Sequence, residues 1–220
     1  KHGKNILSII EKTYKGNHPL YIEALRVCGA NLGMTGELKE AEKILNKAEN
    51  WVKNELNADS AILLEVLSSK GSLYLSGYNL ENAEKTFFKA IQLAKENNLT
   101  ETFRYAKCND YIGIVCLQTG RFEKANEYFS EAMTYYQNNN YGNSGHVGAL
   151  LINITGAHTY IGNYDLAIQN ANRGLAIWET LGGKNHHYYK VALAKKGACY
   201  VMMKEYEKAL PILDTVTDKC

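Results

Sequence analysis

Apolar residues recur at intervals of three and four along almost the whole chain, and short polar stretches with glycine or asparagine interrupt them. This spacing places the apolar side chains on one face of an α-helix. The pattern therefore predicts an all-α protein. We expect about 11 helices, at residues 3–14, 19–34, 38–55, 60–76, 80–97, 102–118, 122–138, 146–161, 164–181, 187–203 and 206–218.

A short phrase opens every second helix: linker residues, then an aromatic residue or leucine, two mostly polar residues and an alanine. An internal period of this kind is typical of stacked supersecondary units, here pairs of helices. The repeat alanines, each 42 residues after the one before, are Ala41, Ala83, Ala125, Ala167 and Ala209.

The second helix of each pair has a predicted core stripe. Positions four and seven residues after the alanine lie on the alanine's own face of the helix, so we expect them to be buried. The first of these positions is held by Leu45, Phe87, Phe129, Ala171 and Leu213. The second is held by Ala48, Ala90, Ala132, Gly174 and Val216.

Small residues mark the first helices. A glycine inside a helix costs about 1 kcal/mol relative to alanine, so close approach of two helices at the glycine and alanine positions is the expected compensation. The small residues, 12 positions before each alanine, are Gly29, Gly71, Gly113, Thr155 (beside Gly156) and Gly197. Three other glycines, Gly36, Gly120 and Gly162, fall where a left-handed residue commonly ends a helix.

These features together resemble the tetratricopeptide repeat: a small residue, a leucine or tyrosine three residues later, a turn, an aromatic residue and the alanine. The leucine or tyrosine is Leu32, Tyr74 or Tyr200. The sequence departs from the family in its period of 42 rather than about 34. It also lacks the family's terminal proline and early tryptophan; the latter is replaced by Leu25, Leu67, Asn109, Leu151 and Leu193.

Longer repeats with a Gly, His and Pro linker are similar to those of kinesin light chains. Gly16, His18 and Pro19 carry this likeness, and Gly183, His186 and His187 repeat it with histidine in place of proline. The resemblance implies a right-handed α-solenoid of antiparallel helix pairs. We expect one solenoid over residues 1–220, in which a half unit at 1–16 precedes five 42-residue units, and we expect the chain to be a fragment of a longer protein.

Charge and composition narrow the choice of partner. The chain has 25 Lys and Arg against 23 Asp and Glu, a net charge of +2, and no basic run. Nucleic acid and acidic membrane surfaces need a concentrated positive field, so neither is expected as a partner. No apolar run reaches the roughly 18 residues of a membrane span. Five scattered cysteines favour a reducing compartment, so we expect the protein in the cytoplasm.

Motifs for chemistry are missing from the sequence. Gly183 and Lys184 are followed by Asn185, without the earlier glycine of a phosphate-binding loop. His186 and His187 have no third ligand at a metal-site spacing, so we favour a linker cap over a metal site. His158 stands in an apolar stripe and is expected to pack in the core. We therefore predict no enzymatic activity, no cofactor and no metal.

The resemblance implies that the first helices line a concave wall that binds a partner. The wall positions it implies are three and two residues before the small residue of each unit, and one, four and five residues after it; we call this the position rule. Stacking against a neighbouring helix is the alternative role for each residue there. The candidate binding residues are Arg26, Ser69, Ser72, Asp110, Tyr111, Gln118, Asn153, Tyr160 and Lys195. This wall is mixed rather than basic, which favours an extended or helical peptide with apolar anchors over a strongly acidic tail.

Three functions are compatible with these features. The leading hypothesis is an adaptor or scaffold that recruits a protein or peptide. The second is a peptide-sensing domain that controls an attached effector domain, as comparable repeats do in bacterial regulators. The third is a spacer or dimerisation element of a larger protein, for which substitutions in the groove would affect no interaction.

Overall fold

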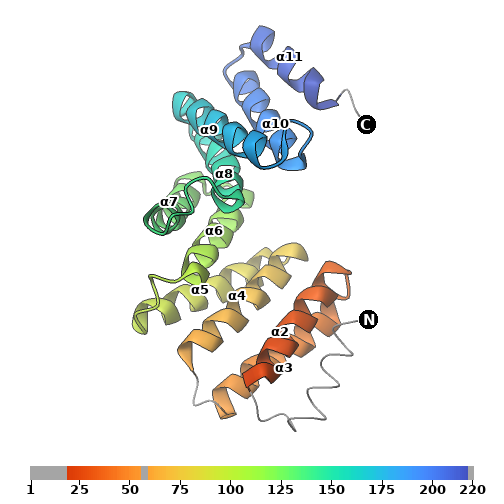
Figure 1. The fold of residues 1–220 in the computed structure, drawn as a ribbon, viewed down its shortest axis with the longest axis vertical. Helices are drawn as coiled ribbons and strands as arrows, with labels where there is room; N and C mark the ends of the chain where they lie inside the picture. Colours follow the sequence, from red (N-terminus) through yellow and green to blue (C-terminus); the bar gives the residue numbers. More distant parts are fainter. Residues whose placement is uncertain (1–18, 56–58, 218–220) are drawn as a thin grey trace. The chain divides into compact units, whose positions relative to one another are not determined.

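The computed structural model describes residues 19–55 and 59–217, which form ten α-helices and contain no strand (Figure 1). The all-α prediction is therefore confirmed, and the expected helix at 3–14 lies outside the described residues. The first helices of the pairs are α2 (Pro19–Met34), α4 (Ser60–Ser76), α6 (Phe103–Gln118), α8 (Gly145–Ile161) and α10 (His187–Met202). The second helices are α3 (Leu38–Glu55), α5 (Leu80–Glu96), α7 (Phe122–Asn138), α9 (Tyr164–Gly182) and α11 (Tyr206–Thr217).

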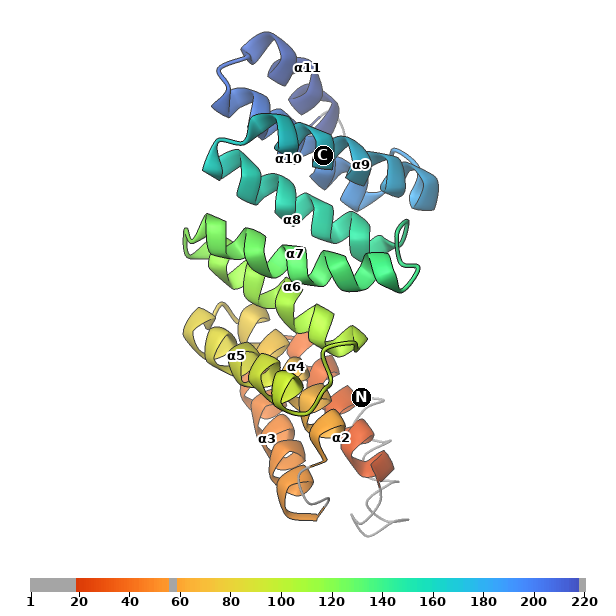
Figure 2. The same cartoon turned by 90° about the vertical axis from the view of Figure 1, so that its left-hand side faces the viewer.

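The helices fall into two compact units, Lys1–Val115 and Cys116–Cys220, divided within α6. In the first unit α2 packs on α3, α3 on α4 and α4 on α5, while α2 also contacts α4. In the second unit each helix from α7 to α11 packs on the next one along the chain, and α8 also contacts α10 (Figure 2). First helices thus lie beside the first helix of the next pair within each unit. That the whole chain forms one continuous solenoid stays a prediction.

Glycine inside the first helices makes room for one large side chain of the second helix. A Cβ on Gly29 would lie 2.7 Å from Cγ of Leu45. A Cβ on Gly71 would lie 2.5 Å from Cε1 of Phe87. The close approach expected from the sequence therefore exists, but each glycine faces the residue four positions after the repeat alanine rather than the alanine itself.

In the fourth pair of helices, the larger residue is on the first helix and the small one is on the second. Thr155 stands at the glycine position and Ala171 at the position of the large side chain, so the volume sits on the first helix instead. Both residues are buried, with exposed fractions of 0% and 2%. The Thr155 hydroxyl donates to the Leu151 carbonyl oxygen at 2.7 Å, which satisfies its buried polar group.

The predicted core stripe is confirmed over most of its length. All five repeat alanines are buried, with exposed fractions of at most 1%. The positions four and seven residues later are also buried in the first four pairs. In the last pair Leu213 and Val216 are only half-buried.

The turn inside each pair places one residue in the left-handed region of φ. Gly36, Gly120 and Gly162 have φ of 83°, 75° and 90°, as expected for residues that end a helix. Tyr78 and Lys204 occupy the same repeat position with φ of 55° and 62°. A side chain disfavours this conformation, so these two turns carry backbone strain that the glycine turns do not.

Candidate functional site

A hollow of about 370 Å³ lies along the first helices of the first unit. It brings together three candidate residues, Ser69, Ser72 and Tyr111. Arg104 of α6 also lines it, although it was not among the candidates. The other lining residues are Ala30, Gly33, Met34, Leu73 and Ser76.

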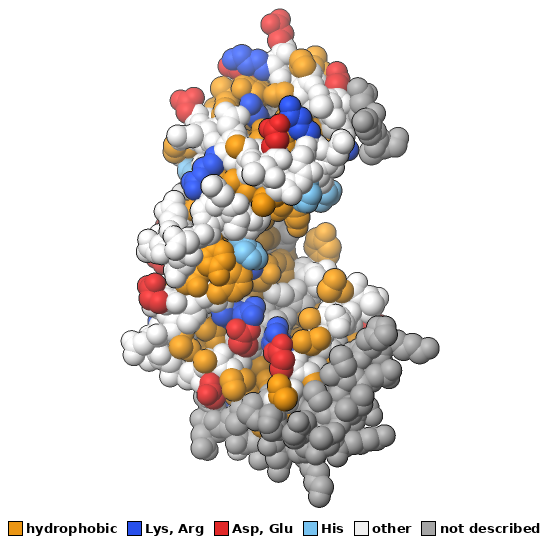
Figure 3. All heavy atoms as spheres, in the orientation of Figure 1, with side chains coloured by type: hydrophobic (Ala, Val, Ile, Leu, Met, Phe, Trp, Pro, Cys, Tyr) orange, Lys and Arg blue, Asp and Glu red, His pale blue; other side chains and the backbone are white. Residues whose placement is uncertain are grey.

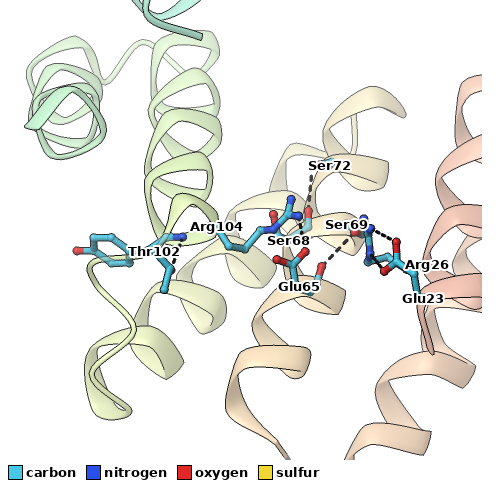
Figure 4. Close-up of polar contacts among 9 residues, drawn as sticks. Glu23, Arg26, Glu65, Ser68, Ser69, Ser72, Thr102 and Arg104 are labelled. Carbon is cyan, nitrogen blue, oxygen red and sulfur yellow. Dashed lines mark hydrogen bonds and ion pairs between the residues drawn. The ribbon is translucent and has the colours of Figure 1, made fainter. Parts of the chain in front are cut away.

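Two ion pairs lie on the helices that line this hollow. On α2, Arg26 binds Glu23 through Nε and Nη2 at 2.9 and 2.5 Å, and the hydrogen bond to Glu23 raises the pKa of Arg26. Figure 4 shows Arg104 reaching from α6 to Glu65 of α4, with which its guanidinium forms an ion pair. Both arginines are thus neutralised by carboxylates.

Arg104 was missed because the candidate positions began three residues before the small residue of each first helix. Glu65 lies six residues before Gly71, and Arg104 lies nine residues before Gly113, so both are nearer the N-termini of their helices. The signal that would have found them is helical spacing, since steps of three residues continue the same face.

Asp110 lies inside the protein rather than on an open wall. Its side chain is 4% exposed, and Oδ2 accepts from Nζ of Lys107 at 2.9 Å. Burial disfavours the charged form of Lys107, but the Asp110 carboxylate outweighs it and raises the pKa of Lys107 overall. The same ammonium stands 4.4 Å from the ring centre of Tyr111. Asp110 therefore orders Lys107 and Tyr111 within α6.

A second hollow, of about 280 Å³, lies in the second unit and is mainly apolar. It brings together the candidates Tyr160 of α8 and Lys195 of α10. Around them lie Gly156, Thr159, Ala198, Val201, Met202 and Leu213. The position rule therefore places side chains of α8 and α10 around one hollow.

Tyr160 is both exposed and held in place. Its exposed fraction is 57%, yet its ring stacks on Phe122 of α7 with centroids 4.6 Å apart and planes 12° apart. Val201 and Met202 of α10 are also exposed, at 39% and 48%. An aromatic ring fixed by stacking loses little conformational entropy when it contacts a partner.

The two remaining candidates line neither hollow. Gln118 is exposed at the end of α6, and Asn153 is half-buried on α8. Acidic and basic side chains are interspersed on the visible face of each unit, without a broad area of one sign (Figure 3). The surface charge on this face is therefore mixed.

Groups with possible chemistry are buried or used in packing. Burial raises the pKa of the Cys108 thiol to about 11, so this thiol is protonated at neutral pH. His158 is 9% exposed, in line with the expected core position, and burial lowers its pKa. Nδ1 of His186 accepts from the Tyr188 backbone N–H at 3.3 Å, so this histidine caps α10 as predicted.

Within residues 19–55 and 59–217, no group of three or more His, Cys, Asp or Glu side chains is arranged to hold a metal ion. None of the described helices combines the length and apolar character needed to cross a bilayer.

Sequence comparison links the second unit to a known family. The family model described as tetratricopeptide repeat matches residues 147–218. Outer dynein arm-docking complex subunit 4 of Homo sapiens is 28% identical over 96 residues, which cover 44% of this chain and 14% of that protein. The chain therefore spans a small part of this relative's length.

Solved structures show the same fold. BtubC (BKLC) from P. vanneervenii is similar with a TM-score of 0.85 and 20% identity, over 99% of this chain and 87% of that one. The tetratricopeptide-like repeats of a putative kinesin light chain from Podosopora anserina are similar with a TM-score of 0.76 and 12% identity. This match covers 90% of this chain and 94% of that one. A Rap protein complexed with Competence and Sporulation Factor is similar with a TM-score of 0.70 and 17% identity. This match covers 98% of this chain and 58% of that one.

Proposed function

We propose that the chain is a protein-interaction scaffold that binds a peptide or protein along its first helices. Residues 147–218 match the tetratricopeptide repeat model, and the fold is similar to that of the repeats of a putative kinesin light chain, which supports this role. The hollow between α8, α10 and α11 is the proposed centre of this site in the second unit. It takes an apolar side chain of the partner against the ring of Tyr160.

One observation carries this proposal: a large aromatic ring is left exposed in an apolar hollow although a stacking partner already fixes its orientation. Residues that only cover a neighbouring helix become buried, as Phe129 and Tyr136 are. Tyr160 instead stays 57% exposed beside Val201 and Met202. Rigid aromatic anchors surrounded by apolar side chains are typical of binding hot spots.

The charge around this hollow supports a partner that is not strongly basic. Lys195 contributes a cation to the lining, and in the described part of the chain its ammonium group has no carboxylate partner. The next residue, Lys196, instead donates to Oδ1 of Asn172 at 2.7 Å. Lys195 thus remains able to hydrogen-bond to a partner.

A sensing role is the second candidate function. The Rap structure with the same fold is a complex with Competence and Sporulation Factor, so this architecture binds that factor in that protein. In a sensor, the ligand changes the activity of an attached effector domain, whereas an adaptor only brings proteins together. Measuring the activity of any attached domain with and without the partner separates the two.

We also propose that the protein is not an enzyme and that it works in the cytoplasm. Cys28, Cys108, Cys116 and Cys199 are buried and free of disulfide bonds, which suits a reducing compartment. The buried thiol of Cys108 has too high a pKa to serve as a nucleophile at neutral pH.

Affinity capture with variants tests the proposed site. We expect Tyr160→Ala, alone or with Asn153→Ala, to deplete a specific partner from the captured proteins, as measured by quantitative mass spectrometry. Tyr206→Ala is the matched control, because Tyr206 is a tyrosine of the same unit with 56% exposure that does not line the hollow. Circular dichroism checks that all variants keep their helices. Capture that is unchanged by Tyr160→Ala would refute the proposed centre of the site.

A further inference from the structure

The lining of the hollow in the first unit combines apolar side chains with three serines and a single charged residue, Arg104. Arg26 is paired with Glu23, and Arg104 is paired with Glu65. A partner's carboxylate placed beside Arg104 would also lie near Glu65, and a partner's ammonium group would meet the guanidinium of Arg104. The lining therefore selects against both kinds of charged side chain.

Three serines of α4 present hydrogen-bond acceptors to this hollow. The Ser69 hydroxyl donates to the Glu65 carbonyl oxygen at 3.0 Å, and Ser72 donates to that of Ser68 at 2.9 Å. Ser76 donates to the Leu73 carbonyl oxygen at 2.9 Å. Because a hydroxyl has one proton and two lone pairs, each oxygen can still accept but no longer donates.

An apolar side chain is a poor occupant for the same reason. It would remove water from the serine oxygens without replacing the lost hydrogen bonds, and an unsatisfied polar group is costly to bury. The hollow of the second unit is more strongly apolar, and no serine is among its lining residues.

We propose that the hollow of the first unit binds an uncharged carboxamide side chain, that of asparagine or glutamine, in a partner peptide. The two N–H groups of a carboxamide diverge by about 120°, so with bonds of about 2.9 Å they reach two acceptors about 5 Å apart. Helix residues three apart have Cβ atoms separated by about 5–6 Å. Ser69 and Ser72 have this spacing on α4.

Arg104 supplies the complementary donor for the carboxamide oxygen. A guanidinium carries five N–H donors. Among the described residues its only partner is Glu65, which is paired with Nη2. Tyr111 also lines the hollow. The lining thus offers acceptors for N–H and a donor for the oxygen, the combination that a carboxamide requires.

This inference rests on the proposed partner-binding function but concerns a different unit. Tyr160 and its hollow belong to the second unit, and Ser69, Ser72 and Arg104 belong to the first. Loss of the carboxamide preference would leave partner capture through Tyr160 unaffected, and loss of that capture would leave the carboxamide preference unaffected.

Blocked amino acids, N-acetylated and N-methylamidated, test the inference by NMR titration of the whole ¹⁵N-labelled chain. Glutamine is compared with its near-isosteres glutamate and norleucine at millimolar concentrations. We expect the glutamine probe to give saturable shifts of backbone amide signals in α4 and α6, with an affinity at least about fivefold higher than that of either isostere. Equal affinity for glutamate or norleucine, or no saturable shift with glutamine, would overturn the proposal.

Serine variants link the effect to the hollow. Ser72→Ala removes one acceptor and should weaken glutamine binding about fivefold, the effect of one hydrogen bond. Ser130→Ala is the matched control, since the Ser130 hydroxyl makes the same bond within its helix, to the Asn126 carbonyl oxygen at 2.8 Å, on an exposed part of α7. It should leave binding unchanged. Identical binding by wild type and Ser72→Ala would contradict the assignment of the acceptor.

Discussion

Replacing Gly71 by alanine probes the contact that sets the repeat register. A Cβ at this position would lie 2.5, 2.7 and 2.8 Å from Cε1, Cδ1 and Cζ of Phe87, whose side chain is fully buried. Alanine in place of a helical glycine gains about 1 kcal/mol of helix propensity. Overpacking a tight core costs about 1–3 kcal/mol. The clash outweighs the gain, so we expect Gly71→Ala to destabilise the protein by about 1 kcal/mol.

Gly174→Ala is the control for this substitution. Gly174 is also a buried glycine inside a helix, but a Cβ there would lie 3.5 Å from Cβ of Leu151, an ordinary contact. This variant should gain up to about 1 kcal/mol in stability. The assay is urea denaturation followed by circular dichroism and by tyrosine and tryptophan fluorescence. If Gly71→Ala stabilised the protein as much as Gly174→Ala, the proposed role of the glycine would be wrong.

A double variant separates the steric clash with Phe87 from the gain in helix propensity. Phe87→Ala removes the ring and should cost about 3–5 kcal/mol. In that background Gly71→Ala no longer meets an obstacle, so it should become stabilising by about 1 kcal/mol. The combination of a larger first-helix residue with alanine opposite is the one that Thr155 and Ala171 already show. A Gly71→Ala effect of the same sign and size in both backgrounds would show that Phe87 is not the obstacle.

Further predictions concern strain, thiol reactivity and pH. Tyr78→Gly and Lys204→Gly should each raise stability by about 1 kcal/mol in thermal denaturation, because they relieve positive φ, whereas Gly36→Ala should lower it by a similar amount; equal effects at the three positions would contradict this. Cys108, with its pKa raised to about 11, should resist iodoacetamide at pH 7.5 until the protein unfolds, and rapid labelling of the native state would contradict its burial. Burial lowers the pKa of His158, so its neutral form is favoured in the folded state; the associated stability is present above the unfolded-state pKa of about 6.5 and is lost as the pH falls through the folded pKa. His158→Gln should therefore reduce the loss of stability between about pH 7 and 5, and an unchanged pH profile would show that His158 does not contribute.

Helix positions were predictable because one repeat register fixed them all. The bounds of α2, α3, α4 and α7 agree with the sequence prediction, and the other described helices differ by one residue at an end. Five repetitions of the alanine, and four of the glycine 12 residues before it, remove the ambiguity that a single helix pattern would leave. The chain therefore provides its own internal check on every boundary.

Side-chain partners were harder to predict, because periodicity identifies a face but not the neighbours across it. Asp110 occupies a predicted wall position, yet Lys107 on the same helix draws its carboxylate into the protein. Arg104 reaches the first hollow from a position outside the predicted set. The position rule was nevertheless sufficient to select Tyr160 and Lys195, which share one hollow.

The turns show a similar limit. Glycine at 36, 120 and 162 indicated left-handed residues, but nothing in the sequence indicated the same conformation at Tyr78 and Lys204 except their place in the repeat. Packing of the adjoining helices imposes the turn geometry at these positions, whichever residue is present.

Hydrogen exchange of the protein with its captured partner tests the binding proposal most directly. If the partner lies along the first helices, amides in α8 (Gly145–Ile161) and α10 (His187–Met202) should gain protection on binding. The second helices α7 (Phe122–Asn138) and α9 (Tyr164–Gly182) should change little. Protection confined to α7 and α9, with α8 and α10 unchanged, would contradict the proposal that the first helices form the binding surface.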